Sequence, residues 1–361
     1  MTGRLTIGVI ITCFNYEKYV GGCISSVLAQ TRKADEILVI EDGSTDNSRS
    51  AIVSFSDRIT PIYKANEGYK AAINQGFRES HSDVVLFLDA DDALQPDALE
   101  SIESAWRNDL AKVQFDLDII DGAGRLLGRR FSNFDRAISS AEIRDSFNKT
   151  GTYRWPVTSG NAHARRFLEQ VMPLTPPVGH DGVLNTIAPL YGEICTISRS
   201  LGFYRLHGQN MSLLSSKGAV GGHPDFARQI GFRQKEFTIL RDHAKILGVG
   251  LPDGDLLNNE LVFVNYRLMA KKIGMPYPGE ETDHVFALWR RGLALALSSG
   301  DRARVKLSHG LWLSVLTVTP RFLARLLVWL RFNRAQVLST LSRWFHRTIW
   351  PGRKAAGGIA H

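Results

Sequence analysis

Apolar runs and helical patterns alternate along the first hundred residues of the chain. Four runs rich in β-branched and aliphatic residues predict strands that are buried on both faces: Leu5–Thr12, Glu36–Ile40, Ile59–Tyr63 and Asp83–Leu88. Three stretches between them carry apolar residues at helical spacing and predict helices: Tyr19–Gln30, Ser48–Phe55 and Gly68–Ser80. This alternation predicts an α/β fold, a parallel sheet with right-handed crossovers.

The pattern changes after Asp92. Val113–Ile119 predicts one more strand, and Arg125–Phe131 predicts its hairpin partner. After a segment rich in serine, glycine and proline at residues 215–225, helical spacing continues over residues 226–274, 285–297 and 303–318. The sequence therefore predicts an α/β domain followed by an α-helical extension.

Polar clusters follow three of the predicted strands, at Thr12–Asn15, Glu41–Asp46 and Asp89–Asp92. In an open parallel sheet, ligands bind beyond the carboxyl ends of the strands, so we expect these clusters to meet at one edge. The three carboxylates of the last cluster would repel one another near a buried strand end, and Mg²⁺ or Mn²⁺ would resolve that repulsion. The alternative is that Asp92 caps a helix beginning near Pro96 while Asp89 is exposed.

The composition narrows the class of protein. Of the 361 residues, 44% are hydrophobic and 22% are charged, which excludes a disordered chain, a collagen and a polytopic membrane protein. Cys13, Cys23 and Cys195 are scattered and odd in number, which argues against a disulfide framework or a thiolate zinc site and favours a reducing, cytosolic compartment. The chain opens on a predicted strand without a secretory signal pattern.

The charge is unevenly placed. The net charge is +8, yet residues 286–361 hold 13 lysines and arginines against one acid, Asp301. Such a basic tail points to a membrane surface or a nucleic acid. The apolar run Leu307–Thr319 is too short to span a bilayer, which takes about 20 residues.

Beyond Pro320 a helix would be amphipathic. One face would carry apolar residues, interrupted by Arg334, at Leu323, Leu326, Leu327, Leu330, Val337, Leu341 and Trp344. The opposite face would carry Arg321, Arg325, Arg343 and Arg347. This pattern predicts a helix lying in a membrane interface, with packing on the catalytic body or on a second subunit as the alternative. Because no base-reading motif accompanies the charge, we expect no nucleic acid partner.

Four blocks resemble the nucleotide-binding half of family 2 glycosyltransferases of the GT-A fold: VIITCFNYEKYVGGCISSVLAQT, EILVIEDGSTDNS, NEGYKAAINQGF and VVLFLDADDAL. The resemblance is strong over residues 5–100 and looser over 101–212. It implies a Rossmann-like, mainly parallel sheet flanked by helices. We therefore divide the chain into a catalytic domain at 1–218, a helical region at 219–300 and a basic amphipathic tail at 301–361.

The resemblance also implies site residues. The positions matching those that bind the nucleotide and its sugar are Thr12, Phe14, Asn15, Asp42, Asn66, Lys70, Asn74, Asp89 and Ala90. Among them, Thr12 and Phe14 would cradle the base, and Asp42 would accept a hydrogen bond from a base N–H. Asp89 and Asp91 match the DxD pair, with Asp91 as the direct ligand of Mn²⁺ or Mg²⁺.

Two later motifs resemble the same family. Gly179-His180-Asp181 is similar to its Glu-Asp motif with histidine in place of glutamate, which implies that Asp181 is the general base. The alternative is that Asp181 caps a helix over Val183–Leu190. The stretch YRLHGQNMS at 204–212 implies that His207 completes the metal site or contacts phosphate. Trp155 lies where acceptor sugars commonly dock, although a core tryptophan fits equally well.

Together these features predict a metal-dependent, inverting transfer of one sugar from a nucleoside diphosphate donor, with UDP expected, to a glycan or lipid-linked acceptor. We expect this in cell-surface polysaccharide synthesis at the cytosolic face of a bacterial membrane, and leave the oligomeric state open. A nucleotidyltransferase would carry a Gly-rich basic loop where this chain has TCFNYEKY. A catalytically silent nucleotide-sugar-binding module would keep the fold without the base. A dinucleotide-dependent dehydrogenase is disfavoured because no GxGxxG follows the first strand.

Overall fold

The computed structural model describes residues 4–132, 134, 136, 138–175, 179–207 and 223–333. The chain divides into two units, the first formed by residues up to 209 together with 231–260, and the second by residues 210–230 and 261 onward. This division differs from the predicted boundary at residue 218, because residues 231–260 group with the first unit. The predicted boundary between residues 300 and 301 stays a prediction.

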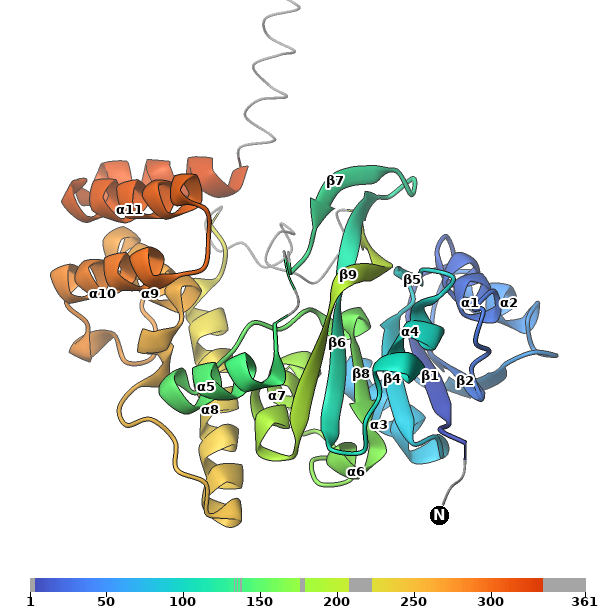
Figure 1. The fold of residues 1–361 in the computed structure, drawn as a ribbon. Coiled ribbons are helices and arrows are strands. Elements are labelled where there is room, and N and C mark those ends of the chain that lie inside the picture. Colours follow the sequence, from blue (N-terminus) through green and yellow to red (C-terminus); the bar gives the residue numbers. More distant parts are fainter. Residues whose placement is uncertain are drawn as a thin grey trace, which may run out of the picture. The chain divides into compact units, whose positions relative to one another are not determined.

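The first unit is built on a nine-stranded sheet (Figure 1). Its strands are β1 (Ile7–Cys13), β2 (Glu36–Asp42), β3 (Thr60–Lys64), β4 (Val84–Asp89), β5 (Ala93–Leu94), β6 (Leu110–Asp121), β7 (Leu126–Arg130), β8 (Asn161–Ala164) and β9 (Glu193–Leu206). The order is β3-β2-β1-β4-β8-β6-β9-β5, with β7 paired to β6. β1, β2, β3 and β4 are parallel, as are β6 and β9, whereas β5, β7 and β8 run antiparallel to their partners.

Helices of the first unit follow the strands. They are α1 (Val20–Leu28), α2 (Ser48–Val53), α3 (Tyr69–Glu79), α4 (Ala98–Ala105), α5 (Ser140–Thr150), α6 (Arg165–Leu168) and α7 (His180–Ile187). The long helix α8 (Phe226–Leu247) crosses the boundary, with residues 231–247 in the first unit. Gly76 lets α3 approach the sheet closely, because a Cβ at that position would overlap the side chain of Ile10 on β1.

The core explains why the N-terminal strands are readable from sequence. β1 is buried at all seven positions and β4 at its first five, so both faces of these strands require apolar residues. The four predicted strands and the three predicted helices between them are confirmed within two residues at each end. The predicted hairpin of β6 and β7 is confirmed as well.

The sequence prediction missed β5, β8, β9, α5 and α6. β9 mixes buried and half-buried positions without a clean alternation, because it lies between β6 and β5 and its register with β6 shifts along its length. A regular period of two is the signal that identifies a strand, and β9 lacks it. The strand still matters for function, because it carries residues 204–206 to the sheet edge and leads to His207.

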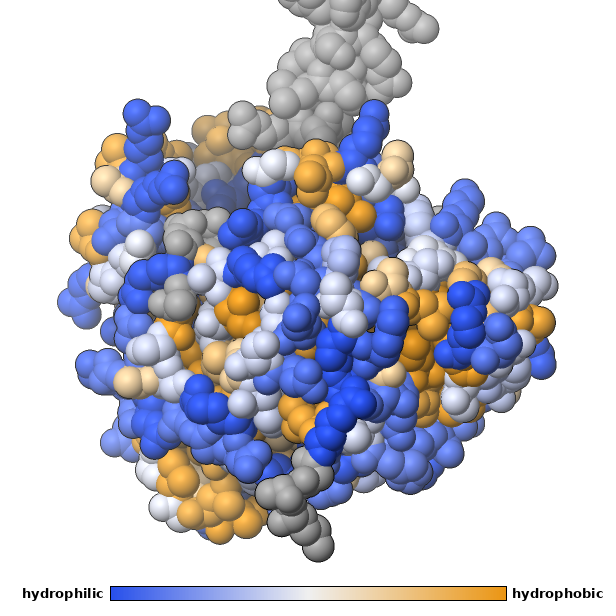
Figure 2. Space-filling view, turned by 45° about the vertical axis from the view of Figure 1, so that its right-hand side comes forward, coloured by the Kyte–Doolittle hydropathy of each residue, from blue (hydrophilic) through white to orange (hydrophobic). Residues whose placement is uncertain are grey.

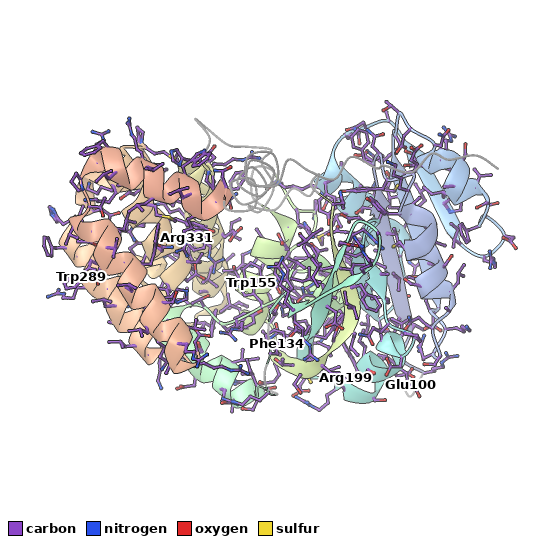
Figure 3. The ribbon with its side chains drawn as sticks, turned by 90° about the horizontal axis from the view of Figure 1, so that it is seen from above. Glu100, Phe134, Trp155, Arg199, Trp289 and Arg331 are labelled. Atoms are coloured by element: carbon purple, nitrogen blue, oxygen red, sulfur yellow. The ribbon has the colours of Figure 1, made fainter. Side chains whose placement is uncertain are left out.

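The second unit is helical in its described part. Its helices are α9 (Leu261–Ile273), α10 (Val285–Ser298), α11 (Ala303–Val318) and a helical segment at 321–333. Trp289 on α10 donates a hydrogen bond to Ser314 on α11 (3.0 Å) and is drawn in Figure 3 with Arg331 of the last segment. Among the described residues, every helix is too short or too polar to cross a bilayer.

The predicted amphipathic tail is described only in its first part. Residues 321–333 are helical, as predicted, but the exposed side chains there include Phe322, which the predicted apolar face left out. Leu327 and Leu330 of the predicted face are half-buried. The other residues named for this tail lie outside the described part of the chain: Arg334, Val337, Leu341, Arg343, Trp344 and Arg347.

Candidate functional site

The carboxyl ends of the parallel strands bring the predicted polar clusters to one edge of the sheet. Thr12 on β1 lies opposite Ile40 on β2 and Asp89 on β4 in the strand register. The segments that follow these strands therefore start side by side, as the strand pattern predicts.

An acidic cluster occupies the end of β4. Asp89, Asp91 and Asp92 each offer a carboxylate oxygen, and these oxygens lie within 4.8 Å of one another. Asp89 accepts a hydrogen bond from the Tyr69 hydroxyl (2.6 Å), and Asp91 accepts one from His207 Nε2 (2.8 Å). Ala90, between the first two acids, is fully buried. The cluster is thus held from α3 on one side and from the end of β9 on the other.

Asp92 has a structural role that differs from the roles of Asp89 and Asp91. It is buried, and accepts hydrogen bonds from Ser159 Oγ (2.6 Å) and from the backbone N–H of Arg205 (3.0 Å). The helix α4 is preceded by Asp97, so the alternative that Asp92 caps this helix is wrong. Asp92 instead joins β4 to β9 and to the turn before β8.

The electrostatics of this cluster suit a cation. Burial, followed by the neighbouring charges of Asp91 and Asp181, raises the pKa of Asp89 to about 7. Burial, followed by the charges of Asp91 and Asp89, also raises the pKa of Asp92 well above its usual range. Carboxylates that repel one another in a buried place are stabilised by a hard divalent cation, so the donor set fits Mg²⁺ or Mn²⁺.

Aromatic rings surround His207. Its imidazole lies 5.8 Å from the ring of Tyr16 and 5.0 Å from that of Tyr19, measured between ring centroids. The guanidinium of Arg205 lies over Tyr19 (5.0 Å) and donates to the carbonyl oxygen of Asp91 (2.8 Å). His207 is therefore fixed beside Asp91, where the sequence predicts a metal or phosphate contact.

The predicted base-binding residues differ in exposure. Phe14 is 42% exposed, so its ring is open to a stacking partner, whereas Thr12 is buried at the end of β1. Within the described part of the chain, the hydroxyl of Thr12 has no hydrogen-bond partner. Asn15 adopts a left-handed conformation (φ 59°) and accepts a hydrogen bond from the backbone N–H of Thr45 (2.8 Å). It thereby ties the loop after β1 to the loop after β2.

Asp42 organises the start of α3. Its carboxylate is buried and accepts hydrogen bonds from Lys64 Nζ (2.8 Å) and from the backbone N–H groups of Glu67 (3.1 Å) and Gly68 (2.9 Å). A carboxylate has about four acceptor positions, so one remains for the predicted base N–H. Asn66 is exposed beside this turn, which agrees with a position near a ligand.

The other two residues predicted on α3 have unlike surroundings. Lys70 is half-buried, and burial lowers the pKa of its ammonium group. Asn74 donates to the carbonyl oxygen of Leu174 (2.9 Å) and accepts from the N–H of the same residue (2.8 Å). Asn74 therefore fixes the segment that leads to α7, and its contact with a nucleotide stays a prediction.

Asp181 lies in the first turn of α7, near the acidic cluster. The residue preceding α7 is Gly179, so Asp181 is not the helix cap that the alternative expected. One of its carboxylate oxygens accepts from the N–H of Gly182 (2.8 Å). Its charge raises the pKa of Asp89, which places the two carboxylates in one electrostatic environment.

Sequence reasoning missed a polar chain that joins α7 to the acidic cluster. The Tyr69 hydroxyl lies 3.3 Å from His180 Nε2, which lies 3.0 Å from Thr158 Oγ1. Burial lowers the pKa of His180, so the imidazole is neutral near pH 7. The replacement of glutamate by histidine in the Glu-Asp motif was the available signal, but its partners become adjacent only in the folded sheet.

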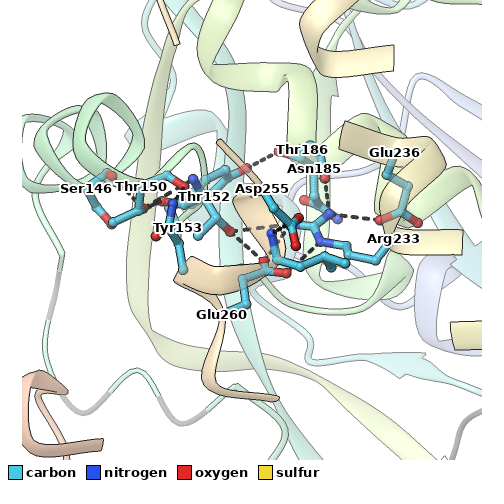
Figure 4. A network of polar contacts seen from close by, with 12 residues as sticks. Ser146, Thr150, Thr152, Tyr153, Asn185, Thr186, Arg233, Glu236, Asp255 and Glu260 are labelled. Atoms are coloured by element: carbon cyan, nitrogen blue, oxygen red, sulfur yellow. Dashed lines mark hydrogen bonds and ion pairs between the residues drawn. The ribbon is translucent and has the colours of Figure 1, made fainter. Parts of the chain in front are cut away.

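A buried ion network supports α7 from the side of α8 (Figure 4). The guanidinium of Arg233 donates to Glu236 (2.8 Å), to Glu260 (2.6 and 2.8 Å) and to Thr186 on α7 (2.5 Å). A Cβ at position 182 would overlap the Glu236 carboxylate, so this carboxylate lies directly against the first turn of α7. The network thus fixes the turn that carries Asp181.

Trp155 lies beside this network. Its ring centroid is 5.8 Å from the Arg233 guanidinium and its side chain is half-buried among the residues of the first unit (Figure 3). A role for Trp155 in docking an acceptor sugar stays a prediction.

The face of the molecule drawn in Figure 2 is mostly hydrophilic, with smaller hydrophobic areas between the polar residues.

Comparisons with known proteins identify a family and relatives that this chain is similar to. Residues 8–167 match the family model described as Glycosyl transferase family 2. The chain is 37% identical over 215 residues to an uncharacterized glycosyltransferase of Nostoc sp., covering 57% of this chain and 66% of that protein. It is 28% identical over 220 residues to glycosyltransferase GlyA of Streptococcus pneumoniae, covering 57% of this chain and 31% of that protein. The chain thus spans less than two thirds of the length of these curated relatives.

Among solved structures, S. aureus TarS 1-349 in complex with UDP-GlcNAc has a similar fold. The TM-score is 0.53 at 15% sequence identity, and the superposition covers 87% of this chain and 90% of that one. At this identity the likeness concerns the fold alone. It confirms the predicted class, an α/β sheet of the GT-A type followed by helices.

Proposed function

The chain belongs to glycosyltransferase family 2 through residues 8–167, and on this premise we propose that it transfers one sugar from a nucleoside diphosphate donor to an acceptor hydroxyl. The observation that carries the proposal is the acidic cluster of Asp89, Asp91 and Asp92 at the carboxyl ends of the parallel strands. Paired carboxylates at this edge match what a diphosphate with a divalent cation requires.

Asp91 and Asp89 would hold the cation, with His207 beside Asp91 (2.8 Å). When bound, Mn²⁺ or Mg²⁺ supplies positive charge that stabilises the departing diphosphate. Tyr69 and Asp92 act on the protein side, because they fix the carboxylate of Asp89 and the strand end that follows it. Each ligand thus enters binding with its side chain already oriented.

Nucleotide binding would use the edge formed by β1, β2 and the start of α3. Phe14 offers an exposed ring for stacking, and Asp42 offers an acceptor for a base N–H. Thr12, Asn15, Asn66 and Lys70 would contribute further contacts at this edge. UDP is our choice of nucleotide, supported by the UDP-GlcNAc complex of TarS, which has this fold.

Asp181 would act as the general base that removes the proton from the attacking hydroxyl. A single base opposite the departing diphosphate leads to inversion at the anomeric carbon. Support comes from its position in the first turn of α7 and from its electrostatic coupling to Asp89. The acceptor would be a glycan or a lipid-linked sugar in cell-surface polysaccharide synthesis, at the cytosolic face of the membrane.

The test separates binding from turnover. We expect the full chain to bind UDP in calorimetry when Mn²⁺ is present, and to lose this affinity when the metal is chelated. Asp181→Asn should keep UDP affinity and reduce sugar transfer or donor hydrolysis by about a hundredfold or more. Asp145→Asn, an exposed acid on α5, is the matched control and should change neither.

Failure of UDP binding with metal would refute the proposed donor. Full turnover by Asp181→Asn would refute only the assignment of the base. A nucleotidyltransferase would instead release pyrophosphate from a nucleoside triphosphate and a sugar phosphate, which the same assay with labelled triphosphate detects.

A further inference from the structure

The outer face of α11 exposes a row of large apolar side chains. Leu307 is 74% exposed, Leu311 64% and Val318 78%, and Val315 lies between the last two. Spacings of four, four and three residues place these side chains on one face of a helix. We call these four residues the outer stripe. Leu313 and Leu316 on the opposite face are buried, so α11 already has a packed side.

Neighbouring helices of the second unit also expose large apolar side chains. Phe322 and Leu326 in the segment 321–333 and Phe286 and Leu297 on α10 are all more than half exposed. Each pair is spaced so that both members share one face of their helix. Soluble proteins rarely leave several large apolar side chains exposed together, and such surfaces mark a binding site.

Basic residues accompany the apolar ones. Residues 286–333 hold eight lysines and arginines against one acid, Asp301. Arg304 precedes Leu307 by one helical turn on the same face, and Arg302 is exposed at the start of α11. Arg321 and Arg325 are exposed beside Phe322 in the next segment. An apolar face bordered by cations is complementary to a surface that is apolar beneath and anionic at its rim.

We propose that the outer stripe docks the second unit onto an anionic lipid bilayer, with α11 lying in the plane of the interface. Charge decides between this partner and a second copy of the chain. Two copies would bring two strongly basic surfaces together, which is unfavourable, whereas anionic headgroups neutralise them. The proposal names a surface in the described part of the chain and does not depend on donor binding, which the first unit carries.

Sedimentation of the full-length protein with lipid vesicles tests the proposal. We expect binding to phosphatidylcholine vesicles that contain phosphatidylglycerol, little binding to phosphatidylcholine alone, and release at about 1 M salt, where charges are screened within about 3 Å. Leu307→Glu with Leu311→Glu should reduce partitioning by about tenfold or more per substitution. Ile246→Glu, an exposed apolar residue of the first unit, is the matched control and should leave partitioning unchanged.

Neutral substitutions separate apolar contact from charge. Leu307→Ser with Leu311→Ser should also reduce partitioning, because the apolar contact is lost without adding a negative charge. Thermal unfolding followed by circular dichroism, without vesicles, reports whether each variant is folded, and its outcome is independent of membrane binding and of UDP binding. Vesicle binding that survives in both double variants would overturn the proposal and assign the membrane contact elsewhere in the chain.

Light scattering after gel filtration measures the mass of the protein in solution and tests whether the outer stripe binds a second copy of the chain instead. A wild-type dimer that becomes monomeric in the double variants, with no vesicle binding in either form, would overturn the proposal in favour of self-association. A wild-type protein whose mass does not change with these substitutions, together with the loss of vesicle binding, supports it.

Discussion

Buried charged side chains held by several partners surround the candidate site of the first unit, whereas a row of large apolar side chains on α11 of the second unit lies in solvent. Asp92 and Arg233 are almost fully buried, and each is fixed by several hydrogen bonds from different elements. Leu307 and Val318 are mostly exposed on a helix whose other side is packed. The first unit thus fixes the side chains of its candidate site by contacts within the unit, whereas the outer stripe is the surface that we propose docks on a lipid bilayer.

Removing one carboxylate of the acidic cluster is the strongest test of the difference between the two units. Asp91→Asn should reduce metal-dependent sugar transfer by about a thousandfold, because the cation would lose a negatively charged ligand. Vesicle binding should be unchanged, since it belongs to the second unit. Steady-state assays at saturating Mn²⁺ and vesicle sedimentation of the same preparation measure both. Equal loss of both activities would show that the two units do not work separately.

The next largest expected effect is on stability and concerns the buried ion network around Arg233. Arg233→Met should lower the free energy of unfolding by about 3–5 kcal/mol, because Glu236 and Glu260 would be left buried without their cation. Lys235→Met, on the exposed side of the same helix, should change it by less than about 0.5 kcal/mol. Urea unfolding followed by circular dichroism measures both variants. A mild effect at position 233 would mean that the carboxylates find other partners.

A pair of leucines on α11 compares the two sides of one helix. Leu313→Ala should cost about 2–4 kcal/mol, because this side chain is buried and a cavity would remain. Leu311→Ala should cost less than about 1 kcal/mol, since most of that side chain is already in water. Thermal unfolding without vesicles tests the difference. Equal costs would place Leu311 in a packed interface, contrary to the outer stripe.

The smallest expected effect is the dependence of Mn²⁺ affinity on pH. The pKa of Asp89 is raised from 3.8 to about 7, so below pH 7 a proton competes with the cation for this carboxylate. Apparent Mn²⁺ affinity should therefore rise by up to about tenfold per pH unit as the pH approaches 7, and level off above it. Calorimetry between pH 6 and 8 measures this. Vesicle binding should be constant over the same range, because lysine and arginine stay charged.

The sequence specified the N-terminal half of the sheet because those strands are buried on both faces. β1 and β4 read as uninterrupted apolar runs, and the acids at the end of β4 follow directly from that reading. β9 was not predicted, because its burial alternates irregularly, although His207 follows it at once. Local sequence carries the period of an element but not the identity of the strands that will flank it.

The same limit applies to the site. Asp89 and Asp91 were predicted from a short local pattern, and the structure brings them together with Asp92. Tyr69 and His180 were not predicted as a pair, because they are 111 positions apart and meet only when α3 and α7 pack on the sheet. Arg233 was assigned to a separate helical region, although its guanidinium bonds Thr186 on α7.

Gly182 has a consequence for how this protein tolerates variation. While the Glu236 carboxylate stays bound to Arg233, its position leaves no volume for a side chain directly after Asp181. In a library randomised at positions 182 and 235 and selected for a folded product, glycine should be recovered almost alone at 182, while 235 accepts most residues. Asp181, the proposed general base, and the glycine that follows it would then be inherited together.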